Sequence, residues 1–331
     1  MSNTVKKIKV GIAGGAGYTG GELIRILLNH PFVEIEFILS KSNTGNYIHS
    51  VHADLLGETD LKFSSQLNDT IDVLFLCMGH GDSKKFLELN PIQPSTRVID
   101  LSQDFRLFGN SSFQTRQFIY GLPELNKQKI QNAKDIANPG CFATAIELSL
   151  LPLAKQQLIK EDIHVSGITG STGAGQSFSE TSHFSWRNNN ISAYKILEHQ
   201  HLSEITESLK GLQSNLKNKV NFIPYRGNFS RGILVTSYLK TNLQVGEAKK
   251  LYDEYYRDHP FTVVTPTNVH LKQVVNTNKC LLYLEKHEDT LVIISAIDNL
   301  LKGASGQAVH NMNLMFGLEE TMGLKLKATA F

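Results

Sequence analysis

One cysteine in this chain stands where a turn meets an apolar helical stretch, and a thiol in that place can act as a nucleophile. Cys141 directly follows Asn138-Pro139-Gly140, which cannot continue a helix or a strand because proline lacks an N–H and glycine tolerates unusual dihedral angles. From Cys141 onward the apolar residues recur with helical periodicity. A helix N-terminus offers unpaired N–H groups and the positive end of the helix dipole, which favour the thiolate. Cys141 is therefore predicted to attack an electrophile; a small buried hydrophobic side chain is the alternative.

A cysteine nucleophile needs an acid–base partner, and the best candidates are His199 and His201. Glu204 lies three residues after His201, so a helix that starts here would place both side chains on one face. Glu204 could then orient His201. An isolated histidine pair is often structural, and in a strand alternating histidines point in opposite directions. The sequence leaves open which of the two histidines carries the proton.

A glycine-rich loop follows the first predicted strand and opens the first predicted helix. Its spacing of Gly14, Gly17 and Gly20 is a variant of the dinucleotide-binding fingerprint. Glycines permit the tight turn and let a pyrophosphate approach the backbone N–H groups of the helix N-terminus. We expect this loop, including Tyr18 and Thr19, to bind a dinucleotide; an ordinary glycine-rich turn is the alternative.

The second predicted strand ends in Ser40-Lys41-Ser42 rather than in an acidic residue. An acidic residue there would bind the ribose 2′-hydroxyl of NAD and repel a 2′-phosphate. Two hydroxyls and a lysine would attract that phosphate instead. NADP(H) is therefore the predicted cofactor, with Ser40 and Ser42 among its binding residues, unless these are only solvated loop residues.

Three further candidate residues follow predicted strands, and the strand before Arg106 is one whose carboxyl end would bind ligands in an open α/β sheet. Arg106 could hold a carboxylate or a phosphate by bidentate hydrogen bonds, or form an ion pair with Asp104. Ser171 lies in the small-residue loop 170–175, which fits either close approach of a substrate or a flexible connector. Asn299 could hydrogen-bond a nicotinamide amide, although its surroundings could equally form a strand-to-helix turn.

The composition limits the function classes. The chain has 331 residues, of which 41% are hydrophobic and 19% charged, which is enough for a folded core in two domains or one large α/β unit. A net charge of +2 gives no reason to expect nucleic acid or an anionic membrane as a partner. Three cysteines without metal-ligand spacing favour a reducing compartment and no metal site. With a short polar N-terminus and no long apolar stretch, the chain is predicted to be cytoplasmic.

The apolar patterns predict an α/β protein whose two halves differ. In the first half, strands alternate with helices, which is typical of βαβ units and a doubly wound parallel sheet. Its predicted strands are 7–13, 33–40, 72–78 and 97–101, and its predicted helices are 20–29 and 83–90. After about residue 145 the pattern predicts an α+β domain with an antiparallel or mixed sheet. Its predicted strands are 163–168, 220–224, 232–240, 280–286 and 290–297, with helices at 246–259 and 306–316.

Taken together, these strings resemble the N-acetyl-gamma-glutamyl-phosphate reductase family, NADPH-dependent enzymes of arginine biosynthesis. The matching segments run in family order along nearly the whole chain: residues 14–20, 100–106, 120–124, 138–141, 170–175, 199–201, 231–233 and 298–313. The Asn-Pro-Gly-Cys and Asp-Asn-Leu-x-Lys-Gly strings are specific to the family, whereas the glycine loop alone is not.

The resemblance implies a fold and an assembly. Residues 1–140 would form a Rossmann-like NADP domain, against which the C-terminal helix 306–331 packs. Residues 141–305 would form an α+β catalytic and oligomerisation domain of the glyceraldehyde-3-phosphate and aspartate-semialdehyde dehydrogenase type. A homodimer or homotetramer is the implied assembly.

The resemblance also implies a reaction, the NADPH-dependent reduction of N-acetyl-gamma-glutamyl phosphate to N-acetylglutamate semialdehyde through a cysteine thioester. Cys141 matches the family's nucleophile, and the pair matching His199 and His201 lies in the active site. We expect His201 to be the acid–base residue. The expected substrate-binding residues are Arg106, Ser171 and Glu204.

The chain departs from the family pattern in two places. The family often reads His-Arg-His-x-Pro-Glu-Ile where this chain has residues 199–205 as His-Gln-His-Leu-Ser-Glu-Ile, and Tyr225 stands where many members have a histidine. These changes could reflect a different N-acyl group. N-succinyl-glutamyl, aminoadipyl and aspartyl phosphates therefore stay open as substrates. A non-catalytic NADP-binding redox sensor with Cys141 as its switch is the alternative from a different class.

Overall fold

The computed structural model describes residues 6–330, which form two compact units. The first unit comprises the chain up to Gly121 together with Asn126–Asn138 and Ser305–Leu324. The second comprises Leu122–Leu125, Pro139–Ala304 and the chain from Lys325 onward. The chain thus changes unit just before Pro139, whereas the sequence-based ranges place Pro139, Gly140 and the two shorter segments of the second unit with the first.

The first unit is built on a seven-stranded sheet in the order β2-β1-β3-β4-β7-β6-β5. Its strands are β1 (Ile8–Ala13), β2 (Val33–Leu39), β3 (Val73–Leu76), β4 (Arg97–Asp100), β5 (Ser112–Phe113), β6 (Arg116–Tyr120) and β7 (Asp135–Ala137). All neighbouring strands are parallel except β5 and β6. All four residues of β3 are buried, as expected for a strand covered on both faces.

The helices of the first unit join these strands in the βαβ pattern that the sequence predicts. They are α1 (Tyr18–Leu28), α2 (Asp82–Leu89), most of α3 (Pro123–Gln131) and α8 (Ser305–Met315). Helix α8 packs against α1 although the two are far apart in the sequence. Helix α3 is interrupted at Asn126, which has non-helical dihedral angles where the chain passes from one unit to the other.

The second unit is built on a seven-stranded mixed sheet in the order β12-β13-β14-β11-β8-β10-β9, which confirms the predicted class of sheet. Its strands are β8 (Ile163–Thr169), β9 (Ser192–Ala193), β10 (Val220–Arg226), β11 (Ile233–Lys240), β12 (Thr262–Val264), β13 (Cys280–His287) and β14 (Thr290–Ile297). The three central strands β8, β11 and β14 are antiparallel to one another in turn. The sequence missed only the short strands β9 and β12 here.

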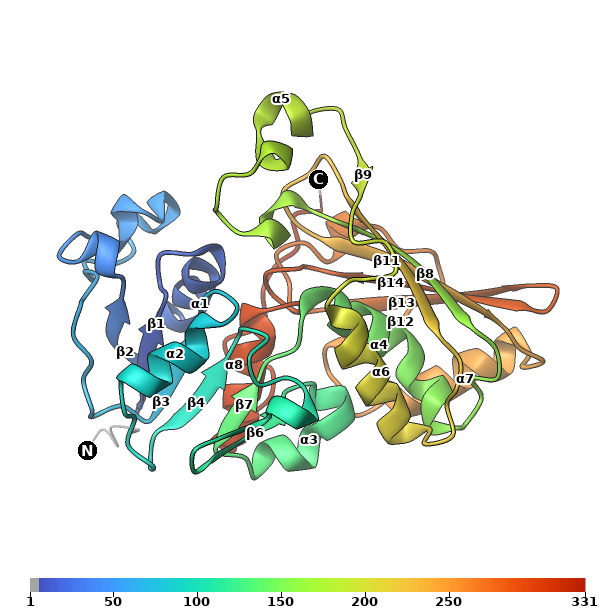
Figure 1. Ribbon diagram of the computed structural model, residues 1–331, viewed down its shortest axis with the longest axis horizontal. Helices are drawn as coiled ribbons and strands as arrows, with labels where there is room; N and C mark the ends of the chain where they lie inside the picture. The colour runs from blue at the N-terminus through green and yellow to red at the C-terminus, as the bar shows by residue number, and fades with distance from the viewer. Residues whose placement is uncertain (1–5, 331) are drawn as a thin grey trace. The chain divides into compact units, whose positions relative to one another are not determined.

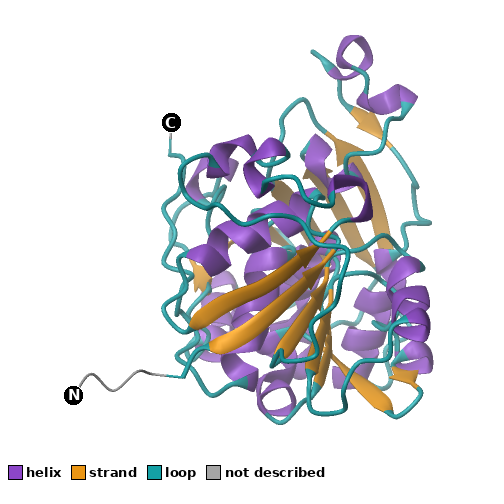
Figure 2. Ribbon diagram, turned by 90° about the vertical axis from the view of Figure 1, so that its left-hand side faces the viewer, coloured by secondary structure: helices purple, strands orange, loops and turns teal. Residues whose placement is uncertain are grey.

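Helices α4 (Cys141–Lys155), α6 (His201–Leu212) and α7 (Val245–Tyr256) cover one face of this sheet (Figure 1). Burial alternates along β11, so every second residue faces these helices. Helix α4 is buried over almost its whole length because it lies between the sheet and its neighbouring helices. In both ribbon views the short helix α5 (Phe184–Arg187) lies apart from that helical layer, on an excursion of the chain that returns through β9 (Figures 1 and 2).

Between residues 6 and 330, no helix is both long enough and apolar enough to cross a membrane.

Candidate active site

Cys141 is the first residue of α4, as the sequence predicts. Gly140 precedes it in an extended conformation (φ −70°, ψ 150°) and makes no side-chain cap, so the first-turn N–H groups are not covered by a capping side chain. The Gly140 carbonyl accepts the Thr144 N–H at 2.8 Å, which closes the first turn. The Cys141 side chain is half-buried rather than sealed in the core. A thiolate here lies at the positive end of a fifteen-residue helix.

His201 lies directly against the backbone that precedes Cys141. A Cβ placed on Gly140 would lie 2.3 Å from the His201 Nε2 atom, so only glycine fits there. Glu204 joins the same cluster: its Oε2 accepts the Gly140 N–H at 2.9 Å, and its Oε1 lies 3.9 Å from His201 Nε2. His201 begins α6 and Glu204 is one turn along, which is the shared helix face that the spacing predicts. Both are about 5% exposed or less.

His199 is a buried neutral neighbour of His201. Its Nδ1 accepts the His201 N–H at 3.2 Å, and the two ring centroids lie 4.6 Å apart. Burial, aided by the positive charge of Lys195, lowers the pKa of His199 to about 4. Because Nδ1 accepts, the ring proton of the neutral form sits on Nε2. The two histidines therefore lie side by side, unlike the strand arrangement that the sequence left open.

The native state is expected to lose stability between pH 6.5 and pH 4 because of His199. An unfolded histidine titrates near pH 6.5. Between pH 6.5 and pH 4 the unfolded chain therefore binds a proton on this ring, whereas the native ring stays neutral. The contribution of the neutral His199 ring to the free energy of unfolding is complete above pH 6.5 and is lost as the pH falls to about 4. The total loss is up to about 3 kcal/mol. Urea unfolding at pH 7 and pH 4.5 measures it. His199→Gln, which keeps an acceptor, should show a weaker pH dependence over this interval; an equal dependence in both proteins contradicts the assignment.

Tyr194 is a site residue that the sequence did not indicate. Its ring centroid lies 5.8 Å from that of His199. Burial and the charge of Cys141 raise the pKa of Tyr194 well above its usual value. The phenol thus stays protonated beside the nucleophile. No motif marks it, because it follows the two-residue strand β9, which is too short to be recognised from the sequence.

The turn after β14 forms another wall of the site. A Cβ on Gly303 would lie 2.8 Å from the Cβ of Cys141, so the glycine lets the two backbones approach closely. Asp298, which is fully buried, accepts the N–H groups of Leu300 and Leu301 at 2.8 and 3.1 Å and holds this turn in shape. Arg231 Nη2 lies 3.0 Å from the same carboxylate.

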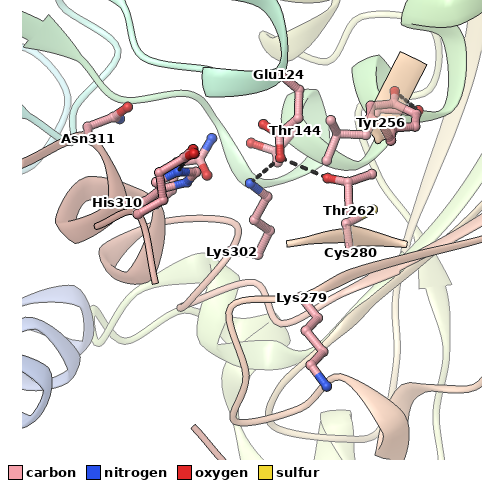
Figure 3. Close-up of polar contacts among 12 residues, drawn as sticks. Glu124, Thr144, Tyr256, Thr262, Lys279, Cys280, Lys302, His310 and Asn311 are labelled. Atoms are coloured by element: carbon pink, nitrogen blue, oxygen red, sulfur yellow. Dashed lines mark hydrogen bonds and ion pairs between the residues drawn. The ribbon is translucent and has the colours of Figure 1, made fainter. Parts of the chain in front are cut away.

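A buried ion pair holds the turn after β14 in place. Lys302 Nζ lies 2.7 Å from Glu124 Oε1, and both side chains are 0% exposed. The Thr262 hydroxyl donates to the same oxygen at 2.7 Å, so two donors converge on Glu124 (Figure 3). Because Lys302 precedes Gly303, the pair fixes the backbone that contacts Cys141.

Ser171 and Asn299 lie in adjoining loops of the second unit. Ser171 opens the 3₁₀ turn Ser171–Ala174, and its N–H donates to the Phe229 carbonyl at 2.9 Å. The Asn299 amide is engaged on both sides: Oδ1 accepts the Gly232 N–H at 2.7 Å and Nδ2 donates to Thr172 Oγ1 at 3.0 Å. The amide therefore ties the two loops together. Contacts of Ser171 with substrate and of Asn299 with cofactor stay predictions.

The glycine loop of the first unit has the form of a phosphate site. Gly14 has φ +81°, and a Cβ there would lie 2.4 Å from the Cys77 carbonyl. A Cβ on Gly20 would lie 2.7 Å from the Gly14 carbonyl, which makes the turn tight. Gly17, the N-cap of α1, has nothing nearer than 3.8 Å and no side-chain cap. With no acidic residue in the first turn of α1, the open space, the backbone N–H groups and the helix dipole are compatible with a bound pyrophosphate. Contacts of Tyr18 and Thr19 with the cofactor stay predictions.

The residues after β2 suit a second phosphate. Ser40 Oγ and Ser42 Oγ each accept a hydrogen bond from Asn43 Nδ2 at 3.1 Å, so each hydroxyl keeps its own proton to donate. Lys41 between them is exposed. Two hydroxyl donors and one ammonium fit the chemistry of a 2′-phosphate.

Arg106 is a buried residue of the first unit, 7% exposed. Its Nε donates to the Asn138 carbonyl at 2.8 Å and its Nη2 to the Leu101 carbonyl at 2.9 Å. It thus supports the chain just before Pro139. Asp104 accepts the N–H groups of Gly81 and Lys84 at 2.6 and 3.0 Å. Binding of substrate by Arg106 stays a prediction.

Solved structures share this fold. Aspartate semialdehyde dehydrogenase II from Vibrio cholerae, in a complex with ASA, is 15% identical with a TM-score of 0.70, over 94% of this chain and 99% of that one. Aspartate semialdehyde dehydrogenase with NADP from Candida albicans is 13% identical with a TM-score of 0.68, over 94% and 99% of the two chains. The predicted pairing of a Rossmann-like domain with an α+β domain of this type is therefore confirmed.

Family models and relatives agree with the fold. Residues 9–133 match the family described as "Semialdehyde dehydrogenase, NAD binding domain", and residues 141–299 match "Semialdehyde dehydrogenase, dimerisation domain". The N-acetyl-gamma-glutamyl-phosphate reductases of Parabacteroides distasonis and Christiangramia forsetii are 60% and 58% identical to this chain, over 98% of it and 100% of their own lengths. The match to a nicotinamide-binding domain and the identity of 58–60% confirm the family that the sequence motifs indicated. The chain belongs to the N-acetyl-gamma-glutamyl-phosphate reductase family.

Proposed function

We propose that this chain reduces N-acetyl-gamma-glutamyl phosphate to N-acetylglutamate semialdehyde by way of a thioester on Cys141, as a step of arginine biosynthesis. One observation carries the proposal: a half-buried cysteine begins α4 while His201 and Glu204 lie against the glycine before it. The names of the full-length relatives support the substrate.

Cys141 carries the covalent chemistry. Its thiolate attacks the acyl carbonyl, the carbonyl–sulfur bond forms, and inorganic phosphate leaves with the electrons of the acyl–oxygen bond. The nicotinamide cofactor supplies, when bound, the hydride that this family of reactions requires. The resulting thiohemiacetal then breaks its carbon–sulfur bond, which releases the aldehyde and regenerates the Cys141 thiolate.

His201 handles the proton of the carbonyl oxygen. As an acid it donates to the oxygen while negative charge develops there, and as a base it takes the proton back when the thiohemiacetal collapses. Glu204 supports this role because its carboxylate lies near His201 Nε2 and also fixes Gly140. His199, with a pKa of about 4, is a poor proton carrier near neutral pH and serves to position His201. The first-turn N–H groups of α4 are further donors to the oxyanion.

The cofactor is NADP(H) rather than NAD(H) in this proposal, and the Ser40-Lys41-Ser42 segment supports it. Lys41→Glu should raise the KM for NADPH about tenfold or more, because it replaces an attraction for the 2′-phosphate with a repulsion. The KM for NADH should stay the same or fall, since NADH has no phosphate there and the new carboxylate can accept a hydrogen bond from its ribose 2′-hydroxyl. Steady-state rates with each cofactor measure both values. A similar change in the two KM values would contradict the assignment.

The description of the family matched by residues 141–299 as a dimerisation domain supports a homo-oligomer, which we propose is a homodimer or a homotetramer. Three free thiols are compatible with the reducing conditions of the cytoplasm. Arg106 is proposed to bind the α-carboxylate or the phosphate of the substrate.

The proposal is tested in the reverse direction, because acyl phosphates are labile. NADP reduction is followed with N-acetylglutamate semialdehyde and phosphate, with arsenate in place of phosphate in a parallel reaction. N-succinylglutamate semialdehyde serves as a second substrate. We expect phosphate-dependent NADPH formation with the acetyl compound. Activity only with the succinyl compound would keep the chemistry and change the substrate; tight NADPH binding without turnover of either would contradict the proposed function and favour a sensor.

A further inference from the structure

Two arginines of the second unit lie close together near the histidine pair. Arg226 ends β10, and Arg187 ends α5 on the excursion that precedes β9. Arg187 is 8% exposed and uses its guanidinium on backbone oxygens: Nη1 donates to the Arg226 carbonyl at 2.9 Å, and Nη2 donates to the Thr181 carbonyl at 2.9 Å. Burial, and then the charge of Arg226, lower the pKa of Arg187. Arg187 is thus a structural support, and Arg226 adds a second positive charge beside it.

Arg226 is less fully engaged, although its side chain also interacts with the Tyr194 hydroxyl. Its Nη1 donates a long hydrogen bond of 3.3 Å to Thr181 Oγ1, while its Nε is buried without a hydrogen-bond partner. Among residues 6–330 it forms no ion pair with a carboxylate, and neither does Arg187. A partly buried guanidinium with an unused donor and no counter-charge is costly unless an anion completes it.

The ring of Tyr194 lies between the Arg226 side chain and the histidine pair of the active site. The Arg226 guanidinium carbon lies 4.9 Å from the centroid of the Tyr194 ring. The Tyr194 ring in turn lies 5.8 Å from His199, whose ring is 4.6 Å from that of His201. An anion on Arg226 would therefore lie next to the groups that surround Cys141. Exposed Lys195 adds positive charge on the same side, since it lowers the pKa of His199.

We propose that Arg226 binds a carboxylate of the acyl substrate and so sets which substrates Cys141 receives; where this is the α-carboxylate, the role proposed for Arg106 is binding of the phosphate. The inference rests on the proposed function, whose substrate and product both keep an α-carboxylate throughout the reaction. An N-succinyl substrate carries a second carboxylate on its acyl group. In either case the planar fork of Arg226 would form paired charge-assisted hydrogen bonds that its present partners do not provide.

The test compares Arg226→Met with Arg226→Lys in the reverse assay. Three substrates are used: N-acetylglutamate semialdehyde, its α-amide, and N-succinylglutamate semialdehyde. Arg226→Met should raise KM about 10- to 100-fold for a substrate whose carboxylate it binds, with a smaller change in kcat. Arg226→Lys keeps the charge but not the fork, so its KM should lie between those of the wild type and Arg226→Met. Lys195→Met removes a nearby exposed charge and controls for a general electrostatic effect.

The substrates separate the two possible carboxylates. If KM rises for the acetyl and succinyl compounds but not for the α-amide, Arg226 recognises the α-carboxylate. If KM rises only for the succinyl compound, Arg226 recognises the carboxylate of the acyl group. Unchanged KM values in Arg226→Met, or equal increases in Lys195→Met, would overturn the inference alone. Absence of turnover by the wild type would overturn the proposed function, and this inference with it.

Discussion

Cys141→Ala is expected to lose about 10⁴-fold or more in turnover while it binds NADPH as the wild type does. Without the thiolate no thioester can form, because alanine leaves no nucleophile at the first residue of α4. The proposed cofactor loop belongs to the first unit, so its glycines and the N-terminus of α1 are unchanged. Steady-state assays measure the turnover, and fluorescence titration measures NADPH binding.

Cys280→Ala is the matched control. Cys280 is fully buried and its thiol lies 3.5 Å from the Ser295 hydroxyl, while burial raises its pKa to about 12. It is therefore an inert structural thiol, and its alanine variant should retain most of the activity. Comparable activity in Cys141→Ala and the wild type, or an equal loss in both variants, would refute the role given to Cys141.

Glu124→Gln should destabilise the protein by about 3–5 kcal/mol, because it removes the negative charge that lies 2.7 Å from the buried ammonium of Lys302. The Thr262 hydroxyl would lose the charge that strengthens its hydrogen bond as well (Figure 3). Activity should fall too, since Lys302 fixes Gly303 against Cys141. Urea unfolding followed by circular dichroism measures the free energy.

Asp289→Asn provides the comparison for that prediction. Asp289 forms an ion pair of similar length with Lys240, 3.0 Å, but the two side chains are 53% and 67% exposed. Water and salt screen such a pair, so its loss should cost less than about 1 kcal/mol. Similar losses in the two variants would mean that burial of Glu124 and Lys302 does not govern their contribution.

Local patterns predicted most of the fold. The helix that begins at Cys141 follows from Asn138-Pro139-Gly140, and β3 follows from its unbroken apolar run, because both signals lie within a few neighbouring residues. Strands of two or three residues, such as β5, β7 and β9, carry too little pattern to be recognised. Residues 122–125 belong to the second unit, where Glu124 contacts Lys302, and a contact between residues 178 positions apart leaves no local pattern in the sequence.

The site was predictable only where chemistry and sequence position coincide. Cys141, His201 and Glu204 could be proposed because their residue types and spacing indicate nucleophile, acid–base group and orienting carboxylate. Tyr194 and Arg226 could not, since each lies next to the site only through the pairing of β9 with β10. The hydrogen-bond partners of the Asn299 amide and the Arg106 guanidinium also depend on tertiary packing, so the sequence does not reveal them.

The central claim, a thioester on Cys141, is tested most directly by mixing the enzyme with NADP and N-acetylglutamate semialdehyde in the absence of phosphate. Without phosphate to release the acyl group, we predict a rapid burst of NADPH equal to the active-site concentration. Intact-mass spectrometry should then show an N-acetylglutamyl adduct, and peptide mapping should place it on Cys141. Phosphate should discharge the adduct. Steady NADPH formation with an unmodified Cys141, or an adduct on another residue, would contradict the account.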